Sequence, residues 1–290
     1  MPPYPLAQLN AATPAEFVAA LGDIFEHAPW VAEAAASRRP FATVTALHEA
    51  MLAILAATPE PQLLRFLNNH PDLASPRERS QSLTADSQRE QTGAGLDLLT
   101  PEETAMLADG NASYRARFGF PFIICALRHS QDAIFAALER RLHGDPASEH
   151  RTALAEIARI SALRLARKVE GDGMPPVFGA LSTHLLDTAT GTPAAGIPIE
   201  LHLVSKTGTR LITAAISNAD GRTDQRLIHG RPIPIGTYEL RFTIGGYFAE
   251  RNIASLYDVV PLRFTVAEAE AHYHIPLLFS PWSYTTYRGS

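Results

Sequence analysis

The spacing of apolar residues changes once along the chain, and this change limits the possible folds more than any other feature. Before residue 170 apolar residues recur at helical intervals, whereas after residue 179 they alternate with polar ones. The stretch EGDGMPPVFG between them has neither period and is rich in glycine and proline, as is typical of a linker. Because 290 residues also approach the upper limit for one hydrophobic core, we predict two domains, 1–170 and 179–290, joined by a linker at 171–178.

The first domain carries clear helix-start signals. In TPAEFVAALGDIF, Thr13 is placed as an N-cap, Pro14 as the first helical residue and Glu16 as its capping-box partner. The stretch TPEETAML repeats this signal at residues 100–103. The last helix brings Arg164 close to an apolar stripe. We expect six or seven helices in all, including those at 44–57, 130–142 and 148–168.

The second domain is predicted to be a β-sandwich. Apolar and polar residues alternate in IPIELHL (197–203) and in YELRFTI (238–244), and glycine, asparagine and aspartate punctuate the chain at short intervals. The stretch AERNIASLYD (249–258) is predicted as a single short helix. The expected fold class is therefore an all-α domain followed by an all-β sandwich.

Charge and composition exclude several classes of function. The chain has 25 basic and 30 acidic residues, so it lacks the basic excess that nucleic-acid backbones require. It has no apolar run of the ~18–20 residues that span a membrane, and its N-terminus lacks a signal-peptide pattern. A lone Cys125, more typical of a core residue than of a nucleophile, excludes an internal disulfide and fits a reducing compartment. We expect a cytoplasmic protein.

Several polar side chains are predicted on the sheet surfaces that face away from the core. Alternation in AHYHIPLLF places His272 and His274 on the outer face, and alternation in LSTHLLD does the same for His184. The Asp-Gly turn in NADGRTD projects Arg222 from the start of a strand. These residues are either solvated surface groups or part of a site. Two histidines two residues apart can chelate zinc, although no third ligand has a suitable spacing.

The final residues, SPWSYTTYRGS (280–290), differ from an ordinary chain end. Chain ends are commonly frayed, polar and expendable. This one carries three large aromatic side chains and an arginine up to its last residues. The pattern indicates either that the tail is pinned as a strand or that its tip belongs to a site.

The stretches STHLLD, DGR and HYHIPLLFSPWSYTTYRGS together resemble the 5-hydroxyisourate hydrolase family, which has the transthyretin-like fold. The resemblance spans about 180–290, and its terminal Tyr-Arg-Gly-Ser is the most specific part. It implies a homotetramer with sites in the channel between dimers, and a tail that ends inside the active site. It also implies that the catalytic residues are His184, Arg222, His274 and Ser290, with Tyr287 binding substrate.

Three stretches of the first domain also concentrate polar residues: NNHPDLAS, LTADSQREQTGAGLD and RFGFPFIICAL. Proline disfavours helix at the preceding residue, so His70 before Pro71 is predicted at a helix end. If 84–93 is helical, Ser87, Glu90 and Gln91 form one polar patch. Each stretch taken alone is also compatible with an exposed polar surface.

Together these three stretches resemble the 2-oxo-4-hydroxy-4-carboxy-5-ureidoimidazoline (OHCU) decarboxylase family, which is all-helical, over about 10–168. The resemblance implies that His70 is the catalytic acid/base and that Glu90 and Gln91 are its partners. Arg164 would bind the substrate carboxylate, and an arginine beside an apolar stripe is costly unless it is paired. The implied substrate-binding residues are Pro71, Ser87, Gln91, Phe120, Pro121, Phe122, Ile123, Ile124 and Arg164.

The two resemblances imply consecutive steps of urate breakdown, because the product of the hydrolase is the substrate of the decarboxylase. We therefore predict an enzyme that hydrolyses 5-hydroxyisourate to OHCU and decarboxylates OHCU to (S)-allantoin. It would act on small molecules, without nucleic acid or membrane partners and without a cofactor or metal. Two alternatives remain: a transthyretin-like carrier of small ligands, and a scaffold in which only one domain is active.

Overall fold

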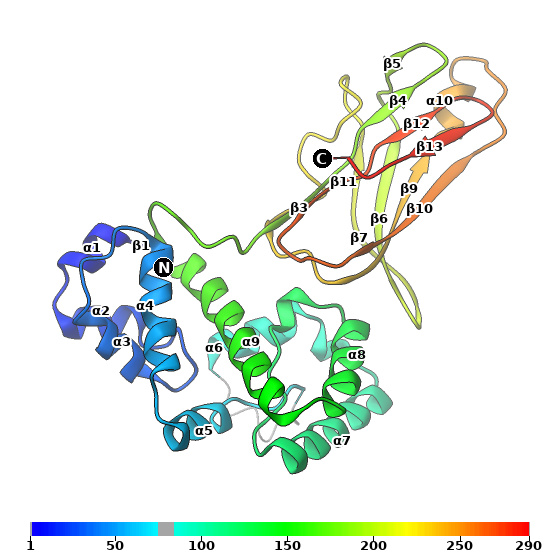
Figure 1. Cartoon of the computed structure of the whole chain (residues 1–290). Coiled ribbons are helices and arrows are strands. Elements are labelled where there is room, and N and C mark those ends of the chain that lie inside the picture. The colour runs from blue at the N-terminus through cyan, green and yellow to red at the C-terminus, as the bar shows by residue number, and fades with distance from the viewer. Residues whose placement is uncertain (1, 75–83, 290) are drawn as a thin grey trace. The chain divides into compact units, whose positions relative to one another are not determined.

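The change in apolar spacing coincides with a division of the chain into two units (Figure 1). The computed structural model describes residues 2–74 and 84–289. The first unit, called the helical unit, comprises Met1–Leu127 and Ile134–Val177. The second, called the β unit, comprises Arg128–Ala133 and Phe178–Ser290. Among the described residues, no helix is long and apolar enough to cross a membrane.

The segment Arg128–Ala133 groups with the β unit although it precedes the linker. The reason is backbone pairing: the Ile235 N–H donates to the Arg128 carbonyl at 2.7 Å, and the Ser130 N–H donates to the Ile235 carbonyl at 2.9 Å. This pairing joins residues more than 100 positions apart and leaves no local trace in the sequence.

Helices dominate the first part of the chain, and α9 packs beside α4 (Figure 1). The predicted helices at 44–57, 130–142 and 148–168 are confirmed to within two residues. The expected total of six or seven was too low because several short helices lack an apolar period long enough to recognise. The helices are α1 (Leu6–Ala11), α2 (Pro14–Leu21), α3 (Pro29–Ala36), α4 (Val44–Ala56), α5 (Glu60–Asn68), α6 (Ala85–Gly93), α7 (Pro101–Phe118), α8 (Gln131–Leu142) and α9 (Pro146–Lys168), with short 3₁₀ turns η2 (Leu96–Leu98) and η3 (Ala126–Arg128).

The two predicted helix starts are confirmed in detail. The Thr13 hydroxyl accepts from the Glu16 N–H, and the Glu16 carboxylate accepts from the Thr13 N–H, which completes a capping box. Thr100 and Glu103 form the same reciprocal pair at the start of α7. Both helices therefore begin where the local sequence predicts.

The helical unit also contains one short pair of strands. β1 (Tyr4–Pro5) pairs in parallel with β2 (Val169–Glu170), which follows directly after α9. The expectation of an all-α domain is therefore only approximate. The pairing brings the beginning of the unit beside its last helix.

The β unit has the two layers of a sandwich. One sheet has the order β10-β9-β6-β7, and the other layer consists of β11-β3-β8 and β13-β12-β4-β5. The inner faces carry buried apolar side chains such as Leu201, Leu240 and Leu277. The strands are β3 (Gly179–Ser182), β4 (Leu185–Asp187), β5 (Thr192–Pro193), β6 (Pro198–Ser205), β7 (Gly208–Ile216), β8 (Ile228–Arg231), β9 (Gly236–Thr243), β10 (Val259–Val266), β11 (His272–His274), β12 (Leu277–Phe279) and β13 (Tyr284–Thr286).

The short helix of the β unit lies earlier than predicted. The structure has α10 at Gly245–Ala249, so the helix expected at 249–258 is wrong. Two backbone N–H groups at its start, those of Ile244 and Gly245, donate to the Asp258 carbonyl at 2.9 Å. Asn252 adopts a left-handed conformation with φ of 55°, which ends the helical path before 258. The glycine pair concealed this helix because glycine disfavours helices.

Two predicted strands are each interrupted. LSTHLLD is divided between β3 and β4 at Thr183 and His184, and AHYHIPLLF is divided between β11 and β12 at Ile275 and Pro276. Proline has no N–H to donate to a ladder, which favours the second break. The predicted inward face continues across both breaks. Leu181, Thr183 and Leu185 are buried around the first, and Tyr273, Ile275, Leu277 and Phe279 are buried around the second.

Candidate active sites

A cavity in the helical unit gathers residues from all three polar stretches. Nine of the residues that line it were predicted from the sequence, and six of these come from the first two stretches and α9: His70, Pro71, Ser87, Glu90, Gln91 and Arg164. Phe122, Ile123 and Ile124 also line it, as expected for the third stretch. Phe120 and Pro121 are buried but do not line the cavity, and Phe120 packs against Tyr114 instead.

His70 follows α5 and is held there by backbone and ring contacts. Its Nδ1 lies 3.2 Å from the Phe66 carbonyl, and its ring meets the Phe66 ring edge-on at 5.0 Å. Burial lowers the pKa of His70 to about 4, because the imidazolium loses its hydration. His70 is therefore neutral near pH 7. With Nδ1–H donated to Phe66, Nε2 remains as a proton acceptor.

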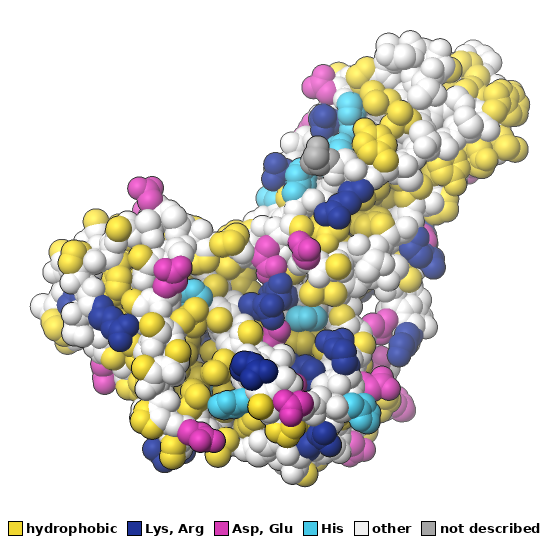
Figure 2. Space-filling model, in the orientation of Figure 1, with side chains coloured by type: hydrophobic (Ala, Val, Ile, Leu, Met, Phe, Trp, Pro, Cys, Tyr) yellow, Lys and Arg dark blue, Asp and Glu magenta, His cyan; other side chains and the backbone are white. Residues whose placement is uncertain are grey.

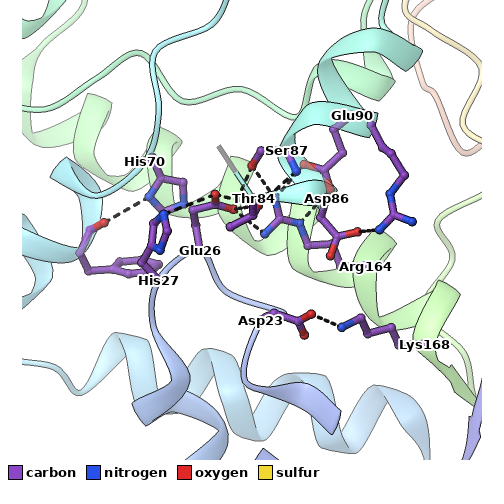
Figure 3. A network of polar contacts seen from close by, with 12 residues as sticks. Asp23, Glu26, His27, His70, Thr84, Asp86, Ser87, Glu90, Arg164 and Lys168 are labelled. Carbon is purple, nitrogen blue, oxygen red and sulfur yellow. Dashed lines mark hydrogen bonds and ion pairs between the residues drawn. The ribbon is translucent and has the colours of Figure 1, made fainter. Parts of the chain in front are cut away.

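Arg164, on α9, is the centre of a buried ion-pair network (Figure 3). Its Nε and Nη2 donate to the two Glu90 oxygens at 2.8 and 2.9 Å, and its Nη1 donates to Glu26 at 2.8 Å. Burial alone would lower the pKa of Arg164, but hydrogen bonds and charge from the two glutamates outweigh it and raise the pKa. Glu90, expected as a partner of His70, thus directs both its oxygens at Arg164.

Glu26 is a member of this network that the sequence reasoning missed. It lies between α2 and α3, is 2% exposed, and accepts hydrogen bonds from Thr84 and Ser87 as well as from Arg164. Burial favours a raised pKa for Glu26, but the charge and hydrogen bond of Arg164 outweigh it and lower the pKa. The available signal, one acidic residue after the apolar pair of GDIFEH, is weak.

Other contacts orient the remaining wall of this cavity. Gln91 Oε1 accepts the Ala74 N–H at 3.0 Å, which leaves the Gln91 amide NH₂ as a donor for a ligand. Arg141 Nη1 donates to the Ile123 carbonyl at 2.8 Å and fixes the chain there. Cys125 is buried, and its N–H donates to Glu156 at 2.9 Å, in agreement with its interpretation as a core residue.

The β unit has its own polar cavity. Ser182, Arg222, His272 and His274 line it, together with residues 223, 224 and 226 of the loop after Arg222. Figure 2 shows histidine and basic side chains gathered on one face of this unit. The cavity therefore combines imidazoles with a guanidinium, as the sequence predicted for this half of the chain.

Ser182 links the two histidines of β11. Its hydroxyl lies 3.0 Å from His274 Nδ1 and 2.9 Å from His272 Nε2. Burial, and then the charge of Arg222, lower the pKa of His274 and favour its neutral form. Sequence reasoning missed Ser182, although it lies two residues before His184 and thus on the same predicted strand face.

His184 lies in the break between β3 and β4. Its Nε2 is buried without a hydrogen-bond partner among the residues that the structure describes. Burial and then Arg222 lower the pKa of His184, against the opposing effect of a hydrogen bond to the Asp220 backbone. His184 is thus electrostatically coupled to Arg222, but it does not line the cavity of a single chain.

The tail is pinned, as one of the two sequence interpretations required. β13 pairs with β12, and the Gly289 N–H donates to the His274 carbonyl at 2.9 Å. A Cβ at Gly289 would lie 2.4 Å from His274 Cδ2, so only glycine permits this approach. Tyr287 is 58% exposed and does not line the cavity, and Ser290 lies outside the described residues.

The sequence left open a zinc site at the two histidines of β11, His272 and His274. In the part of the chain that the structure describes, no group of three or more histidine, cysteine, aspartate or glutamate side chains is placed to hold an ion. The two histidines that suggested zinc, His272 and His274, instead share the Ser182 hydroxyl.

Family models match both halves of the chain. A model described as OHCU decarboxylase matches residues 10–166, and a model described as HIUase/Transthyretin family matches residues 181–289. The two matches fall on opposite sides of the predicted linker.

Individual relatives agree with this division. The first half is 41% identical over 167 residues to an OHCU decarboxylase of Haloferax volcanii, covering 58% of this chain and 97% of that protein. The second half is 49% identical over 113 residues to a 5-hydroxyisourate hydrolase of Deinococcus radiodurans, covering 38% and 95%. A solved structure titled (S)-allantoin synthase is 32% identical and matches 99% of this chain and 100% of its own, with a TM-score of 0.53.

Proposed function

Since the chain belongs to the OHCU decarboxylase family and continues into a HIUase/transthyretin domain, we propose that it catalyses two consecutive steps of urate degradation. The β unit hydrolyses 5-hydroxyisourate to OHCU, and the helical unit decarboxylates OHCU to (S)-allantoin. Similarity to an (S)-allantoin synthase over 99% of the chain supports both steps together.

The observation that carries this proposal is the grouping of each set of motif residues around its own cavity. His70, Ser87 and Arg164 come from different parts of the helical half yet line one cavity. Arg222 and His274 line another in the β unit. A scaffold or carrier has no need of a neutral histidine beside an arginine in both places.

Decarboxylation follows from a neutral His70. The substrate carries a hydroxyl and a carboxylate on one ring carbon, so the electrons of the broken C–C bond can move into the adjacent ring C=N, and no external electron sink is needed. The ring nitrogen that receives the electrons takes up a proton from solvent, which gives an enol. The enol passes its hydroxyl proton to His70 Nε2 and receives a proton on the neighbouring carbon. Delivery of that proton from one face gives a single enantiomer. Arg164 and Gln91 bind and orient the substrate.

Hydrolysis follows from two histidines whose neutral forms are favoured. His184 or His274 accepts a proton from the water molecule that attacks the cyclic acylurea. A protonated histidine then donates a proton to the leaving nitrogen. Arg222 offers a fork of N–H donors to the oxyanion. Ser182 holds the His274 ring at Nδ1, which leaves Nε2 for the reaction.

We also propose that the β unit assembles as a homotetramer. His184 and Tyr287 do not line the cavity of one chain, and further copies would complete it. Large apolar side chains are also exposed on the β unit, and an interface between copies would bury them. The exposed apolar residues of the β unit include Leu211, Ile216, Ile253, Leu256, Trp282 and Tyr287. Size exclusion combined with light scattering should give four times the mass of one 31.5 kDa chain.

Both steps are proposed to need no metal or cofactor, and the lone cysteine supports a reducing compartment such as the cytoplasm. Prolonged dialysis against a strong chelator should leave both activities unchanged. Loss of hydrolysis that zinc restores would make the β-unit site a zinc hydrolase.

One experiment tests the proposed function against its alternatives. Purified protein is added to freshly generated 5-hydroxyisourate, and absorbance and circular dichroism are followed together. The expected result is accelerated decay with formation of optically pure allantoin. A carrier would leave the decay at its uncatalysed rate. A chain with only an active β unit would accelerate decay without giving optically pure product.

A further inference from the structure

Glu26 receives hydrogen bonds from three side chains although it does not line the cavity itself (Figure 3). Thr84 Oγ1 donates to it at 2.9 Å, Ser87 Oγ at 2.9 Å and Arg164 Nη1 at 2.8 Å. Its side chain is only 1% exposed. A carboxylate this buried and this fully bonded is fixed in one orientation.

Its position at the start of α6 explains how it acts on the cavity. Thr84 is the N-cap of α6 and Ser87 lies in its first turn. A carboxylate there is stabilised by the partial positive charge of the helix N-terminus. Since α6 carries three cavity residues, Ser87, Glu90 and Gln91, Glu26 ties this wall to the arginine of α9.

The charges of the cluster do not balance. Arg164 contributes one positive charge, whereas Glu26 and Glu90 contribute two negative charges, and Arg164 holds the pKa of Glu26 low despite burial. His70 is neutral and adds nothing, and the His27 ring, whose Nε2 lies 3.9 Å from Glu26 and whose side chain is 47% exposed, adds a positive charge only when it is protonated. The cluster of Glu26, Glu90 and Arg164 therefore has a formal charge of −1. An arginine meant only to anchor a substrate carboxylate would need spare positive charge, and this one has none.

Building on the decarboxylase activity proposed above, we propose that Glu26 is a positioning residue which, through Arg164, makes this pocket anionic at the point where the substrate carboxylate must leave. Hydrogen bonds from Arg164 and Gln91 hold the substrate, while the net charge repels its carboxylate. The repulsion disappears when the carboxylate becomes neutral CO₂ and its electron pair moves into the ring. Interactions that are less favourable in the ground state than in the transition state raise kcat.

The variant Glu26→Gln isolates this charge. The Gln Oε1 can accept from Arg164 and Ser87 as Glu26 Oε2 does, and its Nε2 can donate to the Thr84 hydroxyl, which also accepts. Size and hydrogen bonds are thereby kept while the formal charge of the cluster rises from −1 to 0. Thr84→Val is the matched control: it removes the hydroxyl that donates to Glu26 and accepts the capping bond from the Ser87 N–H, and it keeps the charge.

The full-length protein is measured at pH 8, well above the ordinary pKa of histidine. For Glu26→Gln we expect kcat and KM of decarboxylation both to fall, each by roughly tenfold, the pattern of lost ground-state repulsion. By calorimetry, hydantoin-5-acetate should bind more tightly by a similar factor, whereas uncharged allantoin should bind as before. Thr84→Val keeps the charge, so it should leave the ratio of the two affinities unchanged. Hydrolysis by the β unit of the same variants should be unchanged and serves as an internal control.

Other outcomes overturn the proposal. A raised KM with weaker binding of hydantoin-5-acetate would make Glu26 a support for a simple carboxylate anchor, and unchanged kinetics would make it purely structural. If circular dichroism shows that Glu26→Gln does not fold, wild-type affinities decide, since tenfold tighter binding of hydantoin-5-acetate than of allantoin contradicts an anionic pocket. A wild type that does not decarboxylate OHCU would refute the proposed function instead, and the ligand comparison would still test the charge.

Discussion

The helical-unit cavity and the β-unit cavity differ in how far one chain completes them. In the helical unit, the side chains of Arg164 and Glu26 are 3% and 1% exposed, and ion pairs link α6, α9 and the α2–α3 connection. In the β unit, the cavity is lined in part by the exposed side chains of Arg222 and His272, and Tyr287 is 58% exposed. The first site is fixed by internal electrostatics. The second is fixed by strand pairing, and by contacts with further copies if the proposed assembly is correct.

Deletion of Tyr287–Ser290 should give the largest difference between the two sites, because it should abolish hydrolysis and leave decarboxylation intact. The truncation removes the Gly289–His274 backbone hydrogen bond and the proposed contacts of Tyr287 and Ser290. Losing one transition-state contact costs roughly 10²–10³ in rate, so several lost together should abolish hydrolysis. Decay of 5-hydroxyisourate measures this, and decarboxylation of separately supplied OHCU should persist. Tyr287→Phe is the milder control, and a truncated protein that hydrolyses normally would make the tail expendable.

His70→Ala tests the site in the helical unit. Loss of a general acid/base typically lowers the rate by about 10²–10⁴, so OHCU should accumulate while hydrolysis continues. The accumulated intermediate and the optical purity of allantoin report this directly. Replacement of the exposed His143 by alanine is the control. Optically pure allantoin at the normal rate from His70→Ala would show that the candidate site is misplaced.

Ser182→Ala tests whether the Ser182 hydroxyl orients His274 for hydrolysis in the β unit. The change removes a hydroxyl that holds His274 Nδ1 and His272 Nε2. One hydrogen bond contributes about 0.5–1.5 kcal/mol, so kcat of hydrolysis should fall by a factor of roughly 2–10. Ser182→Thr keeps the hydroxyl and should retain most of the activity. Equal losses in both variants would point to packing rather than to orientation of His274.

His48→Gln tests the stability of the helical unit rather than its chemistry. Burial lowers the pKa of His48 to about 4, so its neutral form favours the folded state. This stabilisation is complete above the unfolded pKa of 6.5 and is lost as pH falls toward 4. By pH 5 the loss is about 2 kcal/mol.

His48→Gln should remove that part of the pH dependence and retain a polar partner for the Ser161 hydroxyl. Urea unfolding of the full chain at pH 7 and pH 5, followed by circular dichroism, measures the difference. His70 titrates in the same direction, so some dependence remains. Replacement of the exposed His143 by glutamine is the control. An equal loss of stability in wild type and His48→Gln would contradict the prediction.

The features predicted correctly depend on neighbours in sequence. Thr13 with Glu16 and Thr100 with Glu103 are capping pairs three residues apart, so local sequence determines them. Alternation in the strands likewise placed Tyr273 inside and His272 outside. The same local reasoning misplaced α10, whose position depends on hydrogen bonds to the distant Asp258 carbonyl.

For the site in the helical unit, the sequence located His70, Glu90 and Arg164 but not the way in which they connect. Glu90 binds Arg164 across 74 positions, and Glu26 binds it across 138. No spacing rule relates residues so far apart, and only the packing of α9 against the other elements brings them together. Resemblance to a family therefore supplied candidate residues, whereas the charge balance of the pocket required the structure.

The β1–β2 pair of the helical unit has a consequence for how such a chain can arise. Tyr4 and Val169 are partners in this ladder, so the path of the helical unit returns to its own starting point (Figure 1). A unit whose first and last residues lie close together can be joined to another sequence without distorting the fold of either. In recombination terms, the helical unit can be inserted as one segment, except that residues 128–133 pair with the β unit and would have to find that partner again.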